Sequence, residues 1–221
     1  MNRPVRVLVA DDHTIVRKGL CSLLEMEEGI VVVGEAEDGR EALSKIDECR
    51  PDVVLLDITM PGLNGIETTR RINRQYPEVK VVILTMHLNE EYIFEALRAG
   101  ASGYLLKRTA PTDLISAIRA AHRGESFLSP SVSRKVIEQY VQQGGSRTDL
   151  HDPFDTLTTR EREVLQLIAE GRSPSAISDV LFVSVKTVES HRSNLLRKLQ
   201  VKSTAELTQY AVRKGLVSLE E

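Results

Sequence analysis

The chain has 221 residues, of which 41% are hydrophobic and 28% charged, and its formal net charge at pH 7 is −3. This length is sufficient for two domains with separate cores, and the composition is typical of a soluble globular protein. No apolar stretch approaches a membrane span, and the chain starts without an apolar signal region, so we expect a cytoplasmic protein without membrane contact. Cys21 and Cys49 form no CxxC or Cys/His cluster, which predicts buried free thiols.

Short β-branched runs alternate with amphipathic stretches through the first half of the chain. The runs predict strands near residues 5–10, 31–36, 53–56, 80–85 and 103–106. The spacing between them predicts helices that include Thr14 to Glu25, Glu41 to Cys49, Glu90 to Ala99 and Pro111 to Arg123. The first of these helices is expected to have an inner face formed by Ile15, Leu20, Leu23 and Leu24. Repeated strand and helix units favour a parallel sheet covered by helices.

Acidic residues stand at the ends of two predicted strands. Asp11 and Asp12 follow one apolar run, and Asp57 follows another. The carboxyl ends of neighbouring parallel strands converge on one crevice, so we expect these carboxylates to share a pocket. Crowded carboxylates need a compensating positive charge, and an all-oxygen site with few protein ligands suits Mg²⁺.

A hydroxyl and an ammonium group follow at the ends of two further strands. Thr85 ends one apolar run and Lys107 ends the next, so we expect both side chains at the edge of the same pocket. An Asp carboxylate can attack a phosphoryl group while Mg²⁺ and a cation spread the charge on its oxygens and a hydroxyl bonds one of them. A single Asp after a strand is often only a helix N-cap, but the whole set indicates phosphoryl chemistry. Three histidines lack metal-ligand spacing and are expected on the surface or on helix faces, namely His13, His87 and His122.

A connector separates the two halves of the chain. Ser129-Pro130 predicts the start of a short helix that carries Val132, Val136, Ile137 and Tyr140. Gly144-Gly145-Ser146 and the segment from Asp149 to Pro153 are typical of a flexible linker. We predict domains at 1–124 and 154–221 with the connector at 125–153. The apolar stripe of the helix allows packing on either domain or on a second chain.

The second half has no strand pattern and predicts four helices. Thr158 and Glu161 form a capping box ahead of the first helix, and Gly171 closes it. The second helix begins at Pro174, the third covers 185–199 after a cap at Ser184, and the fourth opens at Thr204. Two short helices joined by a turn of three or four residues form the helix-turn-helix unit that reads DNA.

Basic residues concentrate in the last part of the chain. Between Phe182 and Lys214 only Glu189 and Glu206 are acidic, whereas seven residues are basic, namely Lys186, Arg192, Arg197, Lys198, Lys202, Arg213 and Lys214. Contacts with phosphates supply most nonspecific affinity for DNA, so a local basic stripe is sufficient for a DNA-binding surface.

Four motifs of the first half are similar to those of a known family. They are Val9-Ala10-Asp11-Asp12-His13, the segment from Leu56 to Gly65, Leu84-Thr85, and the segment from Gly100 to Lys107. Through them residues 1–124 resemble a response-regulator receiver domain of two-component signalling. The resemblance implies a doubly wound, flavodoxin-like domain with a five-stranded parallel sheet, and phosphotransfer from a histidine kinase onto Asp57 with the help of Thr85 and Lys107. It also implies a Mg²⁺ site formed by Asp11, Asp12, Asp57 and the backbone carbonyl of Thr59, and a switch pair formed by Thr85 and Tyr104.

Residues 157–217 resemble the LuxR-type helix-turn-helix of NarL/FixJ response regulators. The resemblance rests on the segments Leu157 to Leu165, Ala169-Glu170-Gly171 and Val185 to His191, and on Leu199 and Lys202-Ser203. It implies that the helix at 185–199 enters the major groove. The residues expected to contact DNA are then Lys186, Thr187, Ser190, His191, Asn194, Lys198, Lys202 and Ser203.

Together the two halves predict a two-component response regulator rather than an enzyme, because the receiver would catalyse only its own phosphotransfer and dephosphorylation. Phosphorylation of Asp57 would control binding to promoter DNA, with a homodimer as the expected phosphorylated form. The main alternative is a DNA-binding regulator that works without phosphorylation. A phosphatase of the haloacid-dehalogenase type would need a second Asp two residues after the nucleophile, where this chain has Thr59. A transcription factor that senses a small ligand would have no use for the acid triad.

Overall fold

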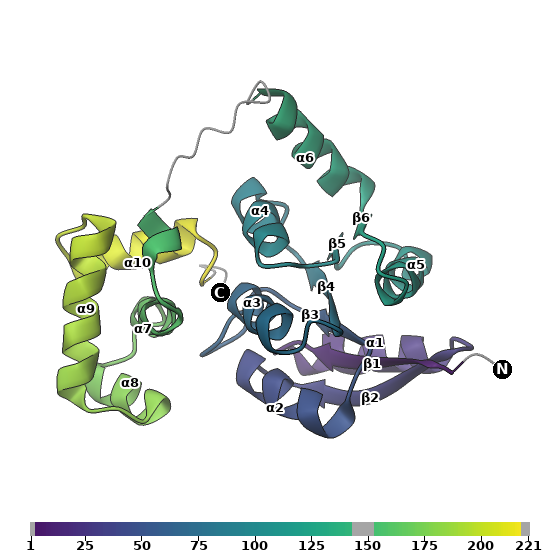
Figure 1. Cartoon of the computed structure of the whole chain (residues 1–221), viewed down its shortest axis with the longest axis horizontal. Coiled ribbons are helices and arrows are strands. Elements are labelled where there is room, and N and C mark those ends of the chain that lie inside the picture. The colour runs from purple at the N-terminus through teal and green to yellow at the C-terminus, as the bar shows by residue number, and fades with distance from the viewer. Residues whose placement is uncertain (1–2, 143–152, 218–221) are drawn as a thin grey trace. The chain divides into compact units, whose positions relative to one another are not determined.

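The computed structural model describes residues 3–142 and 153–217 (Figure 1). It divides the chain into two compact units, 1–145 and 146–221, each with its own hydrophobic core. The predicted linker residues Gly144-Gly145-Ser146 and the segment 149–152 lie outside the described residues.

The first unit contains a parallel sheet whose strands follow the order β2-β1-β3-β4-β5-β6. Five of its strands match the predicted ones, namely β1 (Val5–Ala10), β2 (Ile30–Ala36), β3 (Val53–Leu56), β4 (Lys80–Thr85) and β5 (Gly103–Leu106). The sheet has a sixth strand that the sequence did not predict, β6 (Phe127–Leu128), which pairs in parallel with β5. Two residues are too few to show an alternating pattern, so the predicted count of five strands was one too low.

Helices cover both faces of this sheet. Helices α1 (Thr14–Glu25) and α5 (Pro111–His122) cover one face, and α2 (Gly39–Cys49), α3 (Gly65–Gln75) and α4 (Glu90–Arg98) cover the other (Figure 1). The predicted doubly wound α/β fold is therefore confirmed. One detail was wrong, because Ile15 is 89% exposed whereas Leu24 is fully buried. Ile15 is the second residue of α1 and lies beyond the part of the helix that packs on the sheet.

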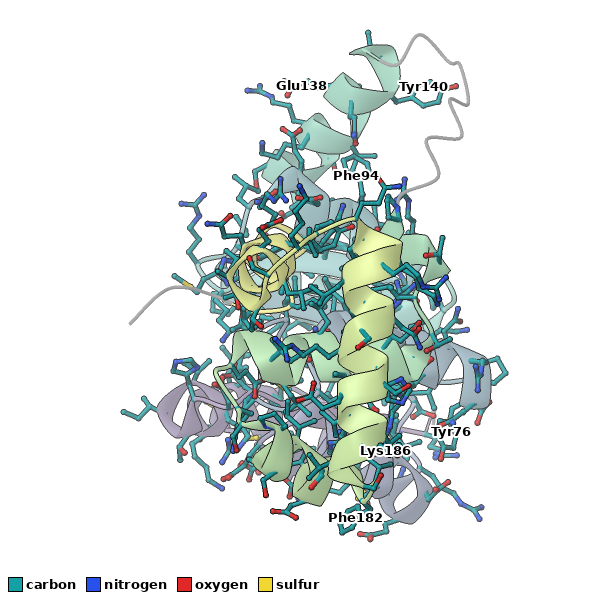
Figure 2. The ribbon with its side chains drawn as sticks, turned by 90° about the vertical axis from the view of Figure 1, so that its left-hand side faces the viewer. Tyr76, Phe94, Glu138, Tyr140, Phe182 and Lys186 are labelled. Carbon is teal, nitrogen blue, oxygen red and sulfur yellow. The ribbon has the colours of Figure 1, made fainter. Side chains whose placement is uncertain are left out.

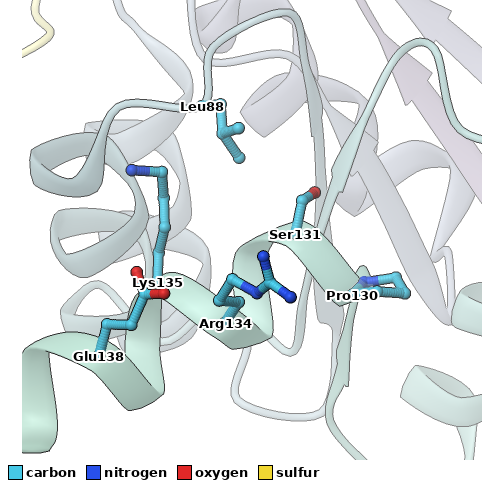
Figure 3. Close-up of a pocket in the computed structure, with 6 residues that line it drawn as sticks. All are labelled: Leu88, Pro130, Ser131, Arg134, Lys135 and Glu138. Carbon is cyan, nitrogen blue, oxygen red and sulfur yellow. The ribbon is translucent and has the colours of Figure 1, made fainter.

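The connector helix α6 (Pro130–Gln142) packs on the first unit, a question that the sequence left open. Val132 is fully buried in the same core as α4, and Lys135 Nζ lies 2.8 Å from Glu90 Oε1. Between this helix and Leu88 is a cleft of about 370 Å³, in which Leu88 faces the side chains of α6 (Figure 3). The outer part of α6 is exposed at Ile137, Tyr140 and Val141.

The second unit consists of helices around a single core. A short 3-10 helix, η1 (Pro153–Thr156), precedes the four predicted helices, which are α7 (Thr159–Ala169), α8 (Pro174–Leu181), α9 (Val185–Leu199) and α10 (Thr204–Arg213). The capping box of Thr158 and Glu161 is present, and Ser184 caps α9 as predicted. The four-helix, helix-turn-helix fold of this unit is confirmed.

The remaining predictions about the chain concern thiols and membranes. Cys21 is a buried free thiol as predicted, whereas Cys49 is free but only half-buried, because it lies in the last turn of α2. Helices that combine enough length with enough apolar character to cross a bilayer are absent from the described residues.

Candidate functional site

Three predicted residues meet at the carboxyl edge of the sheet. Strand β1 lies next to β3 with Ala10 opposite Leu56, so Asp11 and Asp57 follow at adjacent positions. Lys107, which follows β5, places its Nζ 2.7 Å from Asp11 Oδ2 and 2.7 Å from Asp57 Oδ2. Both carboxylates are buried, with exposures of only 2% and 5%. One ammonium group thus bridges two buried carboxylates that are far apart in the sequence.

Burial and charge have opposite effects in this group. Burial raises the pKa of the Asp57 carboxyl above its ordinary value, and the positive charge of Lys107 only partly offsets that increase. Burial by itself would lower the pKa of Lys107, but the charges and hydrogen bonds of Asp57 and Asp11 outweigh it and raise that pKa. The two carboxylates therefore favour the charged form of Lys107, while burial penalises the charged form of Asp57.

Asp12 lies on the open side of the same cluster and is about one-third exposed. Ligand atoms of Asp11, Asp12, His13 and Asp57 all lie within 4.8 Å of one another. His13 Nδ1 approaches Asp12 Oδ1 to 2.8 Å, yet among the described residues no donor makes an aligned hydrogen bond to that oxygen. A buried carboxylate oxygen without a donor, next to two other carboxylates, fits a hard cation such as Mg²⁺.

Thr85 and Tyr104 are both fully buried beside the loop after β4. His87, in that loop, connects them, since its backbone N donates to Thr85 Oγ1 at 3.3 Å and its carbonyl accepts from Tyr104 Oη at 2.9 Å. The His87 ring also bonds Thr59 Oγ1 at 3.0 Å. Burial raises the pKa of Tyr104, which keeps its hydroxyl protonated as a donor. His87 is a partly exposed loop residue, which agrees with the predicted surface position, but these bonds could not be predicted from its spacing.

Other supporting residues were also missed. Arg17 is 4% exposed and donates from Nη1 to the carbonyl of Asp11 at 2.6 Å, while its other nitrogens bond Glu35 and Glu37. A Cβ atom at Gly65 would lie only 2.0 Å from the carbonyl oxygen of Asp57, so this position has no room for a side chain. The sequence shows a basic residue in the first helix and a segment from Pro61 to Gly65 that is rich in turn residues. Neither pattern indicates which residue it contacts.

In the second unit, α8 and α9 are joined by the turn Phe182-Val183-Ser184, which forms the predicted helix-turn-helix. Ser184 Oγ accepts from the backbone N of Thr187 at 3.1 Å and fixes the first turn of α9. Val188 points inward and is 1% exposed, whereas Lys186 and Ser190 are exposed. This part of α9 therefore presents a polar face to solvent.

The other residues expected at DNA have different surroundings. Thr187, His191 and Asn194 are half-buried on α9, and Lys202 is exposed in the loop before α10. Ser203 caps α10 by accepting from the backbone N of Glu206 at 3.2 Å. Lys198 donates to Glu161 Oε2 at 2.7 Å and to the Thr156 carbonyl at 3.0 Å, so its ammonium group holds α9 against α7.

Two family models match the chain. Residues 7–119 match the response regulator receiver domain, and residues 155–211 match the bacterial regulatory proteins of the luxR family. The first match contains the acidic cluster and Lys107, and the second contains α7, α8 and α9.

Relatives with both parts align over nearly the whole chain. The oxygen regulatory protein NreC of Staphylococcus carnosus is 40% identical over 215 residues, which cover 96% of this chain and 99% of that protein. The structure of the RcsB response regulator of Salmonella typhimurium has a TM-score of 0.59 and 32% identity over 95% of this chain and 98% of that one. ChrA, a response regulator of a heme-sensing two-component system, has a TM-score of 0.54 and 34% identity over 98% of this chain and 100% of that one. With its receiver and LuxR-type DNA-binding domains, the chain belongs to the NarL/FixJ family of two-component response regulators, which control transcription.

Proposed function

We propose that Asp57 is the phosphoacceptor of this regulator. The observation that carries the proposal is the Lys107 ammonium group, which lies 2.7 Å from Asp57 inside a cluster of three carboxylates. A carboxylate oxygen of Asp57 attacks the phosphorus of a phosphohistidine on a sensor histidine kinase. The bond from phosphorus to the imidazole nitrogen breaks, and its electron pair returns to the imidazole. The product is an acyl phosphate on Asp57.

The neighbouring side chains stabilise charge during this transfer. Lys107 is placed to neutralise one phosphoryl oxygen, and Thr85 supplies a hydroxyl for another. The same groups serve dephosphorylation, in which water attacks the phosphorus, the bond from phosphorus to the Asp57 oxygen breaks, and the carboxylate and inorganic phosphate are released. The receiver acts in this scheme only on its own acyl phosphate.

Asp12, Asp57 and the backbone carbonyl of Thr59 are the groups that would hold Mg²⁺, with Asp11 beside them. When bound, Mg²⁺ supplies positive charge that offsets the carboxylates and the phosphoryl oxygens. The donor set consists of oxygen atoms, and Asp12 Oδ1 lacks an aligned donor within the part of the chain that the structure describes. His13 Nδ1 lies 2.8 Å from that oxygen and is a poor ligand for Mg²⁺.

Thr85 and Tyr104 form the proposed switch. A phosphoryl group on Asp57 would draw the Thr85 hydroxyl toward it and away from the His87 backbone N. The carbonyl of His87 also accepts the hydrogen bond of the Tyr104 hydroxyl. A movement of Thr85 therefore changes the position of His87 and, through it, that of the tyrosine ring. The phosphate shifts a two-state equilibrium only by the difference in its stabilisation of the two states. The favoured state is a homodimer that binds promoter DNA in the cytoplasm, with two α9 helices about one turn of DNA apart.

The metal assignment predicts a specific loss on removal of one carboxylate. Asp12→Ala is expected to abolish Mg²⁺-dependent phosphorylation by acetyl phosphate. Circular dichroism should show an unchanged fold, because the Asp12 side chain is about one-third exposed and its removal opens no core. Asp38→Ala is the control, since Asp38 is outside the cluster and only caps α2. Normal phosphorylation of the Asp12 variant would place the metal elsewhere.

Salt dependence tests the DNA contacts proposed for α9 and the loop after it. Lys186→Ala combined with Lys202→Ala should weaken binding to all DNA sequences alike. The slope of log K against log salt should fall by about 1.8, at roughly 0.9 per lost phosphate contact. Lys18→Ala combined with Lys80→Ala removes the same charge from the first unit and should leave the slope unchanged. An unaltered slope in the first pair would mean that α9 does not lie in the groove.

A further inference from the structure

The turn of the helix-turn-helix contains an unusual residue. Phe182 is 94% exposed, and its backbone lies in the left-handed region with φ 52° and ψ 47°. Glycine and asparagine adopt this conformation at low cost, whereas a bulky side chain adopts it against a steric penalty. An aromatic residue therefore occupies a position whose left-handed backbone conformation is unfavourable for it, and its side chain gains no packing within its own unit. A cost of this kind points to a function outside the fold.

The neighbours of Phe182 suggest what its ring contacts. Phe182 lies at the same end of α9 as Lys186 (Figure 2). Val185, the first residue of α9 and the sequence neighbour of Lys186, is 44% exposed, so a second apolar side chain is accessible at this end of the helix. In a helix-turn-helix the N-terminal residues of the second helix contact base edges, and Phe182 is only three residues before the start of that helix. The ring is thus on the surface that meets DNA and not on a remote one.

We propose that Phe182 is a DNA-contact residue that packs against the apolar surface at the edge of the major groove. Two apolar groups are available there, the 5-methyl group of thymine and the deoxyribose ring, and Phe is among the side chains that contact the thymine methyl. The contact would add affinity that does not depend on counterion release. This inference rests on the placement of α9 in the groove and names a residue that neither the basic stripe nor the polar face of α9 includes.

The conformation of the turn offers a clean test. Phe182→Asn removes the ring but suits the left-handed backbone, so the variant should fold with an unchanged or higher melting temperature. Its affinity for a DNA fragment that the wild-type protein selects from a random pool should fall about tenfold, the effect of losing a buried apolar contact. The salt slope should stay at the wild-type value, unlike that of the Lys186 and Lys202 variant. Phe182→Leu should recover part of the affinity, and Met26→Asn, which removes an 87% exposed side chain from the first unit, should lose none.

The source of the apolar contact is identified with uracil-substituted DNA. If Phe182 packs on a thymine methyl group, the wild-type protein should lose affinity when uracil replaces thymine, and Phe182→Asn should lose no more. If wild-type affinity is unchanged by uracil while the variant remains weak, the contact is with deoxyribose. Wild-type affinity in Phe182→Asn would overturn the proposal, and a defect confined to transcription would assign the ring to a protein partner instead. The lysine variant separates these outcomes from a failure of groove binding itself, because only the latter leaves both variants unaffected.

Discussion

Replacement of Asp57 by Asn is expected to abolish phosphorylation completely. Acetyl phosphate with Mg²⁺ should add one base-labile phosphate to the wild-type chain, and intact mass should show no adduct on the Asp57→Asn variant. The amide is isosteric with the carboxylate but is not a nucleophile toward phosphorus. Phosphorylation-dependent DNA binding should disappear with the adduct.

The control for this experiment is at the other end of the same strand. Asp52 precedes β3 at its opposite end and accepts a hydrogen bond from the backbone N of Arg6 at 2.8 Å. Asp52→Asn should accept the phosphate normally. An undiminished adduct on Asp57→Asn would remove Asp57 from the mechanism. A wild-type DNA response in that variant, without any adduct, would favour a regulator that works without phosphorylation.

Replacement of Lys107 is expected to affect metal binding and phosphotransfer in opposite directions. Lys107→Met keeps much of the length of the side chain but removes a positive charge 2.7 Å from two carboxylate oxygens. At pH 8, Mg²⁺ affinity by calorimetry should rise about tenfold, because the cation no longer competes with an ammonium group. The rate of phosphorylation at saturating Mg²⁺ should fall about 100-fold or more, because one stabilising charge on the phosphoryl group is lost.

The pH dependence of that variant has a definite sign. Burial already raises the pKa of Asp57, and loss of Lys107 raises it further. The gain in Mg²⁺ affinity should therefore be present at high pH and shrink as the pH falls through the raised pKa and protons occupy the carboxylate. Lys80→Met is the matched control, because the Lys80 ammonium group lies outside the pocket and donates to the Pro77 carbonyl at 3.0 Å. A parallel fall of metal affinity and phosphorylation would instead indicate that Lys107 only maintains the fold of the pocket.

The sequence predicted those parts of the molecule that depend on repeated or paired patterns. Five strands are long enough to show apolar runs, and their carboxyl ends necessarily converge in a parallel sheet, which is why the approach of Asp11, Asp57 and Lys107 could be inferred. Helix starts were also predictable where a cap has its own signature, as at Thr158 and Ser184.

The features that were missed depend on contacts between segments that have no pattern. His87 is a single loop residue whose backbone N, carbonyl and ring each bond a different partner. Arg17 is one of two basic residues in its helix, and only the fold shows that it supports Asp11. The exposure of Phe182 was also not predicted, because Phe is among the residue types most often found buried.

The pairing of β6 with β5 has a consequence for any attempt to isolate the receiver as a separate protein. The backbone of Phe127 bonds the carbonyl of Ser102, and that of Ser129 bonds the carbonyl of Tyr104, so both close the outer side of the strand that leads to Lys107. A chain cut after Gly124 would leave β5 as an open edge and expose the surface that Val132 covers. Open edges of this kind promote association between chains. We therefore expect a receiver fragment that retains β6 and Val132 to associate less than one cut after Gly124.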